Sequence, residues 1–142
     1  MNITPKIYMA GHAFVKQNEK FLLLKRASTT RFMPSKWDVP GGTVEADETI
    51  EKAIAREYME ETALVISVGQ PIFIHTNLLQ MPERKTFQAI YTCDYVSGEV
   101  KLNPREHQEY RWVEAKDLKE YDLISFLIDF VENSDYMRLL GY

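Results

Sequence analysis

Runs of apolar residues predict two strands near the start of the chain. Residues 7–15 carry apolar side chains at both alternate and intervening positions, which is typical of a strand buried on two faces and predicts a central place in a sheet. A second apolar run at residues 21–24 ends in the basic pair Lys25 and Arg26 and predicts another strand. Residues 27–36 contain Ser, Thr, Arg and Pro without periodicity, so we expect a loop there.

Helical periodicity begins near residue 50. At about 100° per residue, Ile50, Ala53 and Ile54 fall on one apolar stripe, which is expected to face a core. Asp47 and Thr49 are both suited to cap the start of this helix, and neither has the Glu or Gln three residues later that completes a capping box. Both residues are therefore candidates for the helix cap.

The second half of the chain contains further strands and a final helix. The pattern predicts strands at residues 64–68, 72–79, 86–96, 99–102 and 110–113, with turn-like segments at 69–71 and 81–85. Apolar Ile124, Leu127, Ile128 and Val131 mark an amphipathic C-terminal helix. Strands on both sides of one helix, with a second helix at the end, predict an α/β fold with the sheet between helices.

Length and composition fit one soluble domain over residues 1–142. A chain of 142 residues, 45% of them hydrophobic, is long enough to bury a core. No apolar run approaches the roughly 18 residues that a membrane helix requires, and the first residues lack an apolar signal segment. A single cysteine, Cys93, permits no intrachain disulfide. We therefore expect a cytoplasmic protein with no membrane partner.

The net charge of −4 argues against a surface dedicated to a nucleic-acid polymer. It does not argue against small phosphorylated substrates, because a bound metal ion reverses the local sign of the charge.

Three carboxylates lie on or beside the apolar stripe of the predicted helix. Glu57 and Glu61 fall in the middle of the stripe, and Glu60 lies at its margin. Like charges at this spacing repel by roughly 0.2 to 0.5 kcal/mol per pair, and inward-facing carboxylates are costly unless a cation meets them. Oxygen ligands of this kind suit hard divalent cations such as Mg²⁺ or Mn²⁺.

The same stretch resembles the Nudix box, the signature of hydrolases that cleave nucleoside diphosphates linked to another group. The matching positions are Gly42, five residues, Glu48, seven residues, and the run Arg56-Glu57-Tyr58-Met59-Glu60-Glu61. Two positions depart from the family pattern: Tyr58 stands where an aliphatic residue is usual, and Ala63 stands where Gly is expected. The resemblance implies the Nudix fold, an α/β/α sandwich with a mixed β-sheet.

The resemblance also implies roles for these side chains. The metal ligands that it implies, for Mg²⁺ with Mn²⁺ as an alternative, are Gly42, Glu57, Glu60 and Glu61. The catalytic residues that it implies are Arg56, Glu60, Glu61 and Glu106. Arg56 and Glu48 are expected to pair and to orient the loop against the helix.

A further acid is expected from outside the box, as base or extra ligand. Glu106 is the candidate, since similar family members place a functional Glu some residues before a Trp such as Trp112. Glu109 competes for this role, and a surface ion pair is the alternative for either residue.

Substrate contacts are expected from the loop and the strand before it. Arg26 and Arg31 are candidates for substrate phosphates and Phe32 for stacking on a base, with Gly42 lining the site. Solvated charge and core packing are the alternatives. His12, His75 and His107 show no metal-ligand spacing, so they are predicted to be structural or exposed rather than catalytic.

The function implied is metal-dependent hydrolysis of a pyrophosphate bond, first of all in a nucleoside triphosphate, including an oxidised one such as 8-oxo-dGTP. A nucleotide sugar or ADP-ribose is the alternative substrate. A catalytically silent nucleotide-binding module is the alternative of a different class. The expected partner is a small nucleotide, and a homodimer is a candidate assembly. Beyond the box, Nudix subfamilies carry residues that are typical of one substrate, and residues 79–82 match none of these patterns cleanly.

Ala63 tests the resemblance most directly. A left-handed conformation at the end of the helix suits Gly and costs a residue with a Cβ roughly 1 to 2 kcal/mol. Because residues 64–66 offer an immediate β run, the helix is predicted to end without that conformation.

Overall fold

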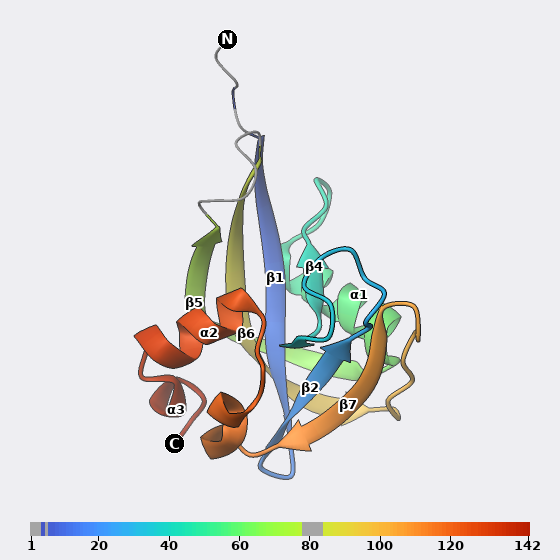
Figure 1. Ribbon diagram of the computed structural model, residues 1–142, viewed down its shortest axis with the longest axis vertical. Coiled ribbons are helices and arrows are strands. Elements are labelled where there is room, and N and C mark those ends of the chain that lie inside the picture. The colour runs from blue at the N-terminus through green and yellow to red at the C-terminus, as the bar shows by residue number, and fades with distance from the viewer. Residues whose placement is uncertain (1–3, 5, 78–83) are drawn as a thin grey trace.

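Strand β1 (Lys6–Gln17) runs through the middle of a mixed sheet in the computed structural model, which describes residues 4, 6–77 and 84–142 (Figure 1). It pairs in parallel with β6 (Arg84–Ser97) and antiparallel with β2 (Lys20–Arg26). Among the described residues, with β3 at Trp37–Asp38 and β5 at Val65–Asn77, the strand order is β3-β2-β1-β6-β5. The predicted central place of the first strand is confirmed, because residues 10–15 are all buried.

The other strands pair antiparallel with these three. Their bounds are β3 (Trp37–Asp38) and β7 (His107–Val113), both on β2, β4 (Gly41–Thr43) on β1, and β5 (Val65–Asn77) on β6. The helices are α1 (Ile50–Thr62), the 3₁₀ helix η1 (Ala115–Glu120), α2 (Ser125–Asn133) and α3 (Tyr136–Leu139).

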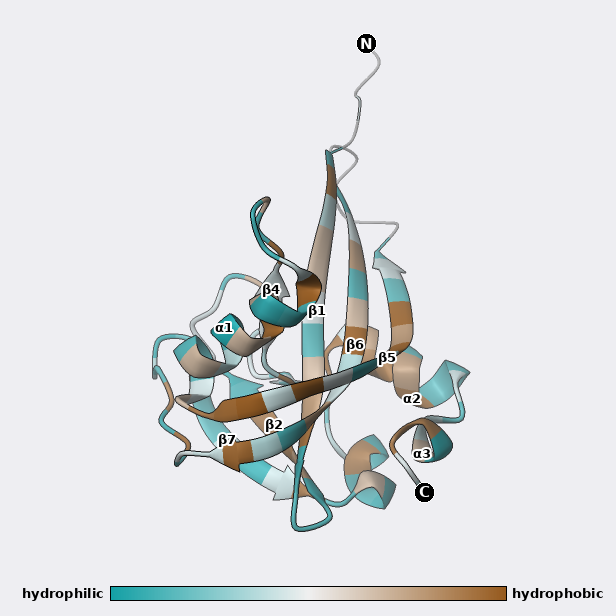
Figure 2. Cartoon of the chain, turned by 180° about the vertical axis from the view of Figure 1, so that it is seen from behind, coloured by the Kyte–Doolittle hydropathy of each residue, from teal (hydrophilic) through white to brown (hydrophobic). Residues whose placement is uncertain are grey.

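Each face of the sheet has its own core. Alternate β1 side chains point to opposite faces, so Ala13 and Val15 join a cluster with Ile54 of α1, whereas Phe14 joins a cluster with Phe130 of α2. Figures 1 and 2, which differ by a half-turn, show α1 on one side of the sheet and α2 and α3 on the other. The predicted α/β/α sandwich with a mixed sheet is therefore confirmed.

Helix α1 is anchored at its start and along its buried side. Thr49 is the cap, and its Oγ1 accepts a hydrogen bond from the Lys52 N–H at 3.2 Å. The buried residues of the helix are Ala53, Ile54, Tyr58 and Thr62. Tyr58, the first departure from the box, fits this buried side because its hydroxyl donates to the carbonyl of Ala13 in the central strand.

The prediction for the end of α1 is wrong. Ala63 adopts the left-handed conformation, with φ 63° and ψ 14°, and its N–H donates to the Met59 carbonyl at 3.0 Å. The chain must reverse at once because Leu64 enters the core, where only 1% of it is exposed. The next segment fastens this reversal, since the Lys101 N–H donates to the Thr62 carbonyl at 2.9 Å.

Several other predictions of strands need correction. Residues 99–102 form no strand. The two strands predicted around residues 69–71 are one strand, β5, whose pairing with β6 shifts register between Val68 and Phe73. Residues 37–43 contain the short strands β3 and β4, which the apolar pattern did not predict; they form because their backbone groups find partners on β2 and β1.

The predicted C-terminal helix is present, and its apolar stripe is confirmed in part. Ile124 and Leu127 are buried in the core and Val131 packs against it, whereas Ile128 is 39% exposed. Phe126 and Phe130 also enter the core. The aromatic residues take the core positions because their rings pack against the aromatic residues of the sheet, as Phe130 does against Phe14 and Phe73.

The predictions for residues 78–79 and 81–83 lie outside the described residues. Within the described ranges, every helix is too short or too polar to cross a lipid bilayer.

Candidate active site

Two adjacent glycines let the loop before α1 approach the acidic side of the helix. The Gly41 N–H donates to Glu61 Oε2 at 2.8 Å. A Cβ on Gly42 would lie 2.5 Å from Glu57 Oε1, and a Cβ on Gly41 would lie 2.2 Å from the Gly11 carbonyl oxygen. Position 41 therefore requires glycine, because its clash is with backbone, whereas a side chain at position 42 would displace the Glu57 carboxylate. The carboxylates of Glu57 and Glu61 thus face the loop backbone.

Arg56 ties this loop to the helix. Its Nε and Nη2 donate to the two Glu48 oxygens at 3.1 and 2.6 Å, and Nη1 donates to Glu57 Oε1 at 3.0 Å. Nη2 also donates to the Thr43 carbonyl at 3.3 Å. The expected pair of Arg56 and Glu48 is thus present as a two-point contact. Hydrogen bonds from Arg56 and from the Glu45 N–H lower the pKa of Glu48 to about 2.

Glu57 and Glu61 point inward, as the helical count predicts. Their side chains are 19% and 14% exposed. Burial raises the pKa of Glu61 well above its ordinary value, although the Gly41 N–H opposes the shift. Burial also raises the pKa of Glu57, opposed by Arg56. Among the described residues no Lys or Arg forms an ion pair with Glu61, so this partly buried carboxylate has no Lys or Arg to neutralise it.

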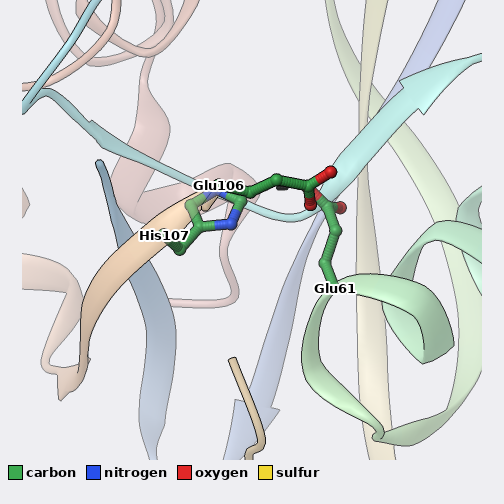
Figure 3. Close-up of side chains that lie close together, drawn as sticks. All are labelled: Glu61, Glu106 and His107. Atoms are coloured by element: carbon green, nitrogen blue, oxygen red, sulfur yellow. Dashed lines mark ion pairs between the residues drawn. The ribbon is translucent and has the colours of Figure 1, made fainter. Parts of the chain in front are cut away.

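Glu106 and His107 approach Glu61 from the start of β7. The residues are adjacent in sequence, and Figure 3 shows the carboxylates of Glu61 and Glu106 facing each other with the edge of the imidazole beside them. His107 Nε2 lies 4.0 Å from Glu61 Oε1, and one ligand atom of each residue lies within 4.8 Å of the others. Burial lowers the pKa of His107, which favours the neutral imidazole.

Two buried polar residues of this region were not predicted to belong to it. His107 is 3% exposed, and Asp38 is 5% exposed at the end of β3. The Asp38 Oδ2 accepts from Arg26 Nη1 at 3.4 Å, and the negative charge of Asp38 raises the pKa of Glu61. The position of Glu106 before Trp112 indicated this segment of the chain, and His107 is the next residue. A single His without metal-ligand spacing gave no reason to select His107.

Two of the predicted acids lie differently. Glu60 is 58% exposed and contacts Arg56 Nη1 only at 3.4 Å, so it faces solvent at the rim. Glu109 pairs with Arg111 Nε at 3.0 Å and is not part of the cluster of Glu61, Glu106 and His107. The structure thus brings Glu106 to Glu61 and leaves Glu109 in a surface ion pair.

The predicted substrate residues Arg26, Arg31 and Phe32 belong to the end of β2 and the segment that follows it. Arg26 is held by Asp38 and by the Phe32 carbonyl, which accepts from Arg26 Nε at 3.1 Å. Arg31 is exposed in the loop, and the Phe32 side chain is 49% exposed. Arg26 is therefore the candidate with a position set by other residues, whereas Arg31 and Phe32 project from the loop.

Comparison with known proteins agrees with this geometry. Residues 8–133 match the model of the NUDIX domain family. The chain belongs to the Nudix family. The chain is therefore an enzyme of the Nudix hydrolase class, and its box is the loop and helix that Gly41, Gly42 and Arg56 hold together.

Relatives of this Nudix hydrolase include nucleoside triphosphatase NudI of Escherichia coli K12, 33% identical over 118 residues that cover 77% of this chain and 83% of NudI. A crystal structure of a MutT protein from Methanosarcina mazei Go1 is 30% identical, covers 99% of this chain and 100% of that one, and superposes with a TM-score of 0.80. The solution structure of the E. coli ORF135 protein, at 24% identity and 96% and 93% coverage, shares the fold with a TM-score of 0.80.

Proposed function

We propose that this Nudix hydrolase cleaves the pyrophosphate bond of a nucleoside triphosphate and releases a nucleoside monophosphate and pyrophosphate. The likeness to a protein named nucleoside triphosphatase NudI supports this substrate class. The observation that carries the reaction is the cluster at Glu61, where a buried carboxylate faces a second carboxylate, Glu106, and no Lys or Arg of the described residues forms an ion pair with it.

The residues of the cluster fit a divalent cation. The carboxylate oxygens are hard donors, and Gly42 leaves Glu57 room to lie against the loop. Glu57, Glu61 and Glu106 would hold the ion, with Glu60 at the rim. When bound, Mg²⁺ or Mn²⁺ supplies charge neutralisation for the phosphate oxygens and Lewis acidity toward water.

The protein side chains would then position and deprotonate the attacking water. Water attacks a phosphorus atom of the anhydride and its proton passes to the Glu106 carboxylate, at the oxygen that does not bind the ion. The leaving group, pyrophosphate or the nucleoside monophosphate, departs with the bridging oxygen. The Gly41 N–H keeps the Glu61 carboxylate in place. Arg56 holds the loop against the helix through Glu48, and Arg26, already oriented by Asp38, contacts the substrate phosphates.

Purified protein should be screened with Mg²⁺ and with Mn²⁺ against nucleoside triphosphates, 8-oxo-dGTP, ADP-ribose and nucleotide sugars. We expect turnover of triphosphates with release of pyrophosphate rather than orthophosphate. A preference for ADP-ribose or a nucleotide sugar would show that the proposed substrate class is wrong, while cleavage of a pyrophosphate bond would still be the reaction. Nucleotide binding without turnover, by a protein that binds the metal, would favour a silent binding module instead.

The domain organisation, cellular compartment and assembly belong to the same proposal. The chain acts as one domain over residues 1–142, in the cytoplasm, on a small nucleotide. Size-exclusion chromatography with light scattering tests the homodimer.

A further inference from the structure

The position of His107 is not explained by packing alone. It is the first residue of β7 and is 3% exposed, yet its Nδ1 makes no hydrogen bond among the described residues. Its Nε2 faces Glu61 Oε1 at 4.0 Å, which is too long for a hydrogen bond. Buried polar atoms without partners are uncommon in native proteins, so the unpartnered Nδ1 shows that hydrogen bonds to the chain do not hold this ring in place, while its other nitrogen, Nε2, is turned toward Glu61.

The other two histidines have partners of their own. His12 Nδ1 lies 3.4 Å from the Val39 carbonyl oxygen, and its ring packs on Phe126. His75 Nδ1 lies 2.7 Å from Asp129 Oδ2. His107 is therefore the histidine of the described chain whose ring has no committed hydrogen-bond partner and lies beside two carboxylates.

The spacing of these atoms suits a shared ion. Two atoms that each bind one ion at about 2.1 Å can be at most about 4.2 Å apart. The 4.0 Å between His107 Nε2 and Glu61 Oε1 falls below this limit. The largest separation within the cluster with Glu106 is at most 4.8 Å, so a shift of up to about half an ångström or slightly more in the exposed Glu106 side chain completes the set.

We propose that His107 is a nitrogen ligand of the divalent cation held by Glu61 and Glu106. The proposal rests on the metal site of the proposed function and adds a donor that the sequence motif does not contain. Carboxylates alone suit Mg²⁺, whereas imidazole raises the affinity for Mn²⁺, Co²⁺ and Zn²⁺ more than for Mg²⁺. The site is thereby tuned toward transition metals.

Pulsed electron paramagnetic resonance of the Mn²⁺-loaded, untagged protein tests the nitrogen ligand without substrate. We expect modulation from a directly bound ¹⁴N, which changes when the protein is made with ¹⁵N-labelled histidine. The signal should vanish in His107→Gln and persist in His75→Gln, the matched control on the other face of the sheet. Mn²⁺ binding by the wild-type protein without a histidine signal would overturn the proposal and leave the carboxylate site standing.

Metal titration provides a second measurement that does not depend on turnover. Relative to wild type, His107→Gln should lose on the order of tenfold in affinity for Co²⁺ and far less for Mg²⁺. Equal losses for the two ions would mean that His107 only supports the carboxylates, and the proposal would fail. Failure of the wild-type protein to bind any divalent cation would instead refute the metal site of the proposed function. Circular dichroism confirms that each variant is folded.

Discussion

At Glu61, stability and chemistry make opposite demands on one side chain. Burial raises the pKa of this carboxyl, so ionising it in the folded protein costs free energy. The Gly41 N–H offsets only part of this cost, and a divalent cation would offset more. Glu61 therefore destabilises the metal-free fold, and the proposed reaction explains why a carboxylate stands at this position.

Glu61→Gln should lower turnover by at least about two orders of magnitude and stabilise the metal-free protein at neutral pH. Because the folded-state pKa lies above the unfolded value, the native state binds more protons, and wild-type stability falls as pH rises above that unfolded value. In EDTA the variant should melt roughly 2 °C or more above wild type at pH 7.5, and the gain should disappear near pH 4. Calorimetry from pH 4 to pH 7.5 checks the sign of this difference in melting temperature. A variant that melts below wild type at pH 7.5 would contradict the prediction.

Glu106→Gln should reduce kcat about a hundredfold or more, whereas Glu109→Gln should change it less than about threefold. The reason is position: Glu106 faces Glu61, and Glu109 is paired with Arg111 at the surface. Steady-state kinetics at saturating Mg²⁺ compare the two variants. The reverse order would move the role of base to Glu109.

At the scale of elements, the end of α1 carries a local strain that the rest of the fold imposes. The left-handed Ala63 lets Thr62 and Leu64 both be buried, while the neighbouring segment holds the Thr62 carbonyl. The conformation costs an alanine roughly 1 to 2 kcal/mol, and glycine avoids that cost.

Ala63→Gly should therefore raise the free energy of unfolding by several tenths to about 1 kcal/mol, after allowing for the greater freedom of glycine in the unfolded chain. Ala55→Gly is the matched control, because Ala55 is exposed within the same helix and should lose about 1 kcal/mol on substitution. Denaturant unfolding measures both variants. A decrease of similar size in the two would show that Ala63 is unstrained.

At the scale of the whole molecule, the sheet separates two cores that serve different purposes. The α1 face supports the acidic side of the helix through residues such as Ile54 and Tyr58. The opposite face is an aromatic core in which Phe130, fully buried, packs against Phe14, Phe73 and Tyr136. Changes in the second core should reach the site only through the shared sheet.

Phe130→Ala should destabilise the fold by about 3 to 5 kcal/mol and leave kcat at low temperature within roughly threefold of wild type. The cavity forms in the α2 core, away from the carboxylates on α1. Thermal melts and kinetics at 15 °C separate the two effects, with Tyr58→Phe as the comparison on the α1 face. A large loss of kcat in folded Phe130→Ala would mean that the two faces are coupled.

The sequence by itself determined what depends on neighbours along the chain. The central first strand, the helix with inward Glu57 and Glu61, and the pair of Arg56 and Glu48 follow from periodicity and from a motif whose residues lie within a loop and a helix. These features could be predicted because regular backbone geometry relates sequence spacing directly to side-chain direction.

Only the tertiary structure decided between Glu106 and Glu109 and placed His107 beside Glu61. Glu106 and His107 lie beside Glu61 because β7 pairs with β2, which brings their segment to the C-terminal end of α1. Local periodicity does not encode a contact between residues so far apart in the sequence. The strain at Ala63 has the same origin. Its conformation is chosen by the burial of Leu64 and by a hydrogen bond from Lys101, and the free energy of those contacts outweighs the local preference of alanine.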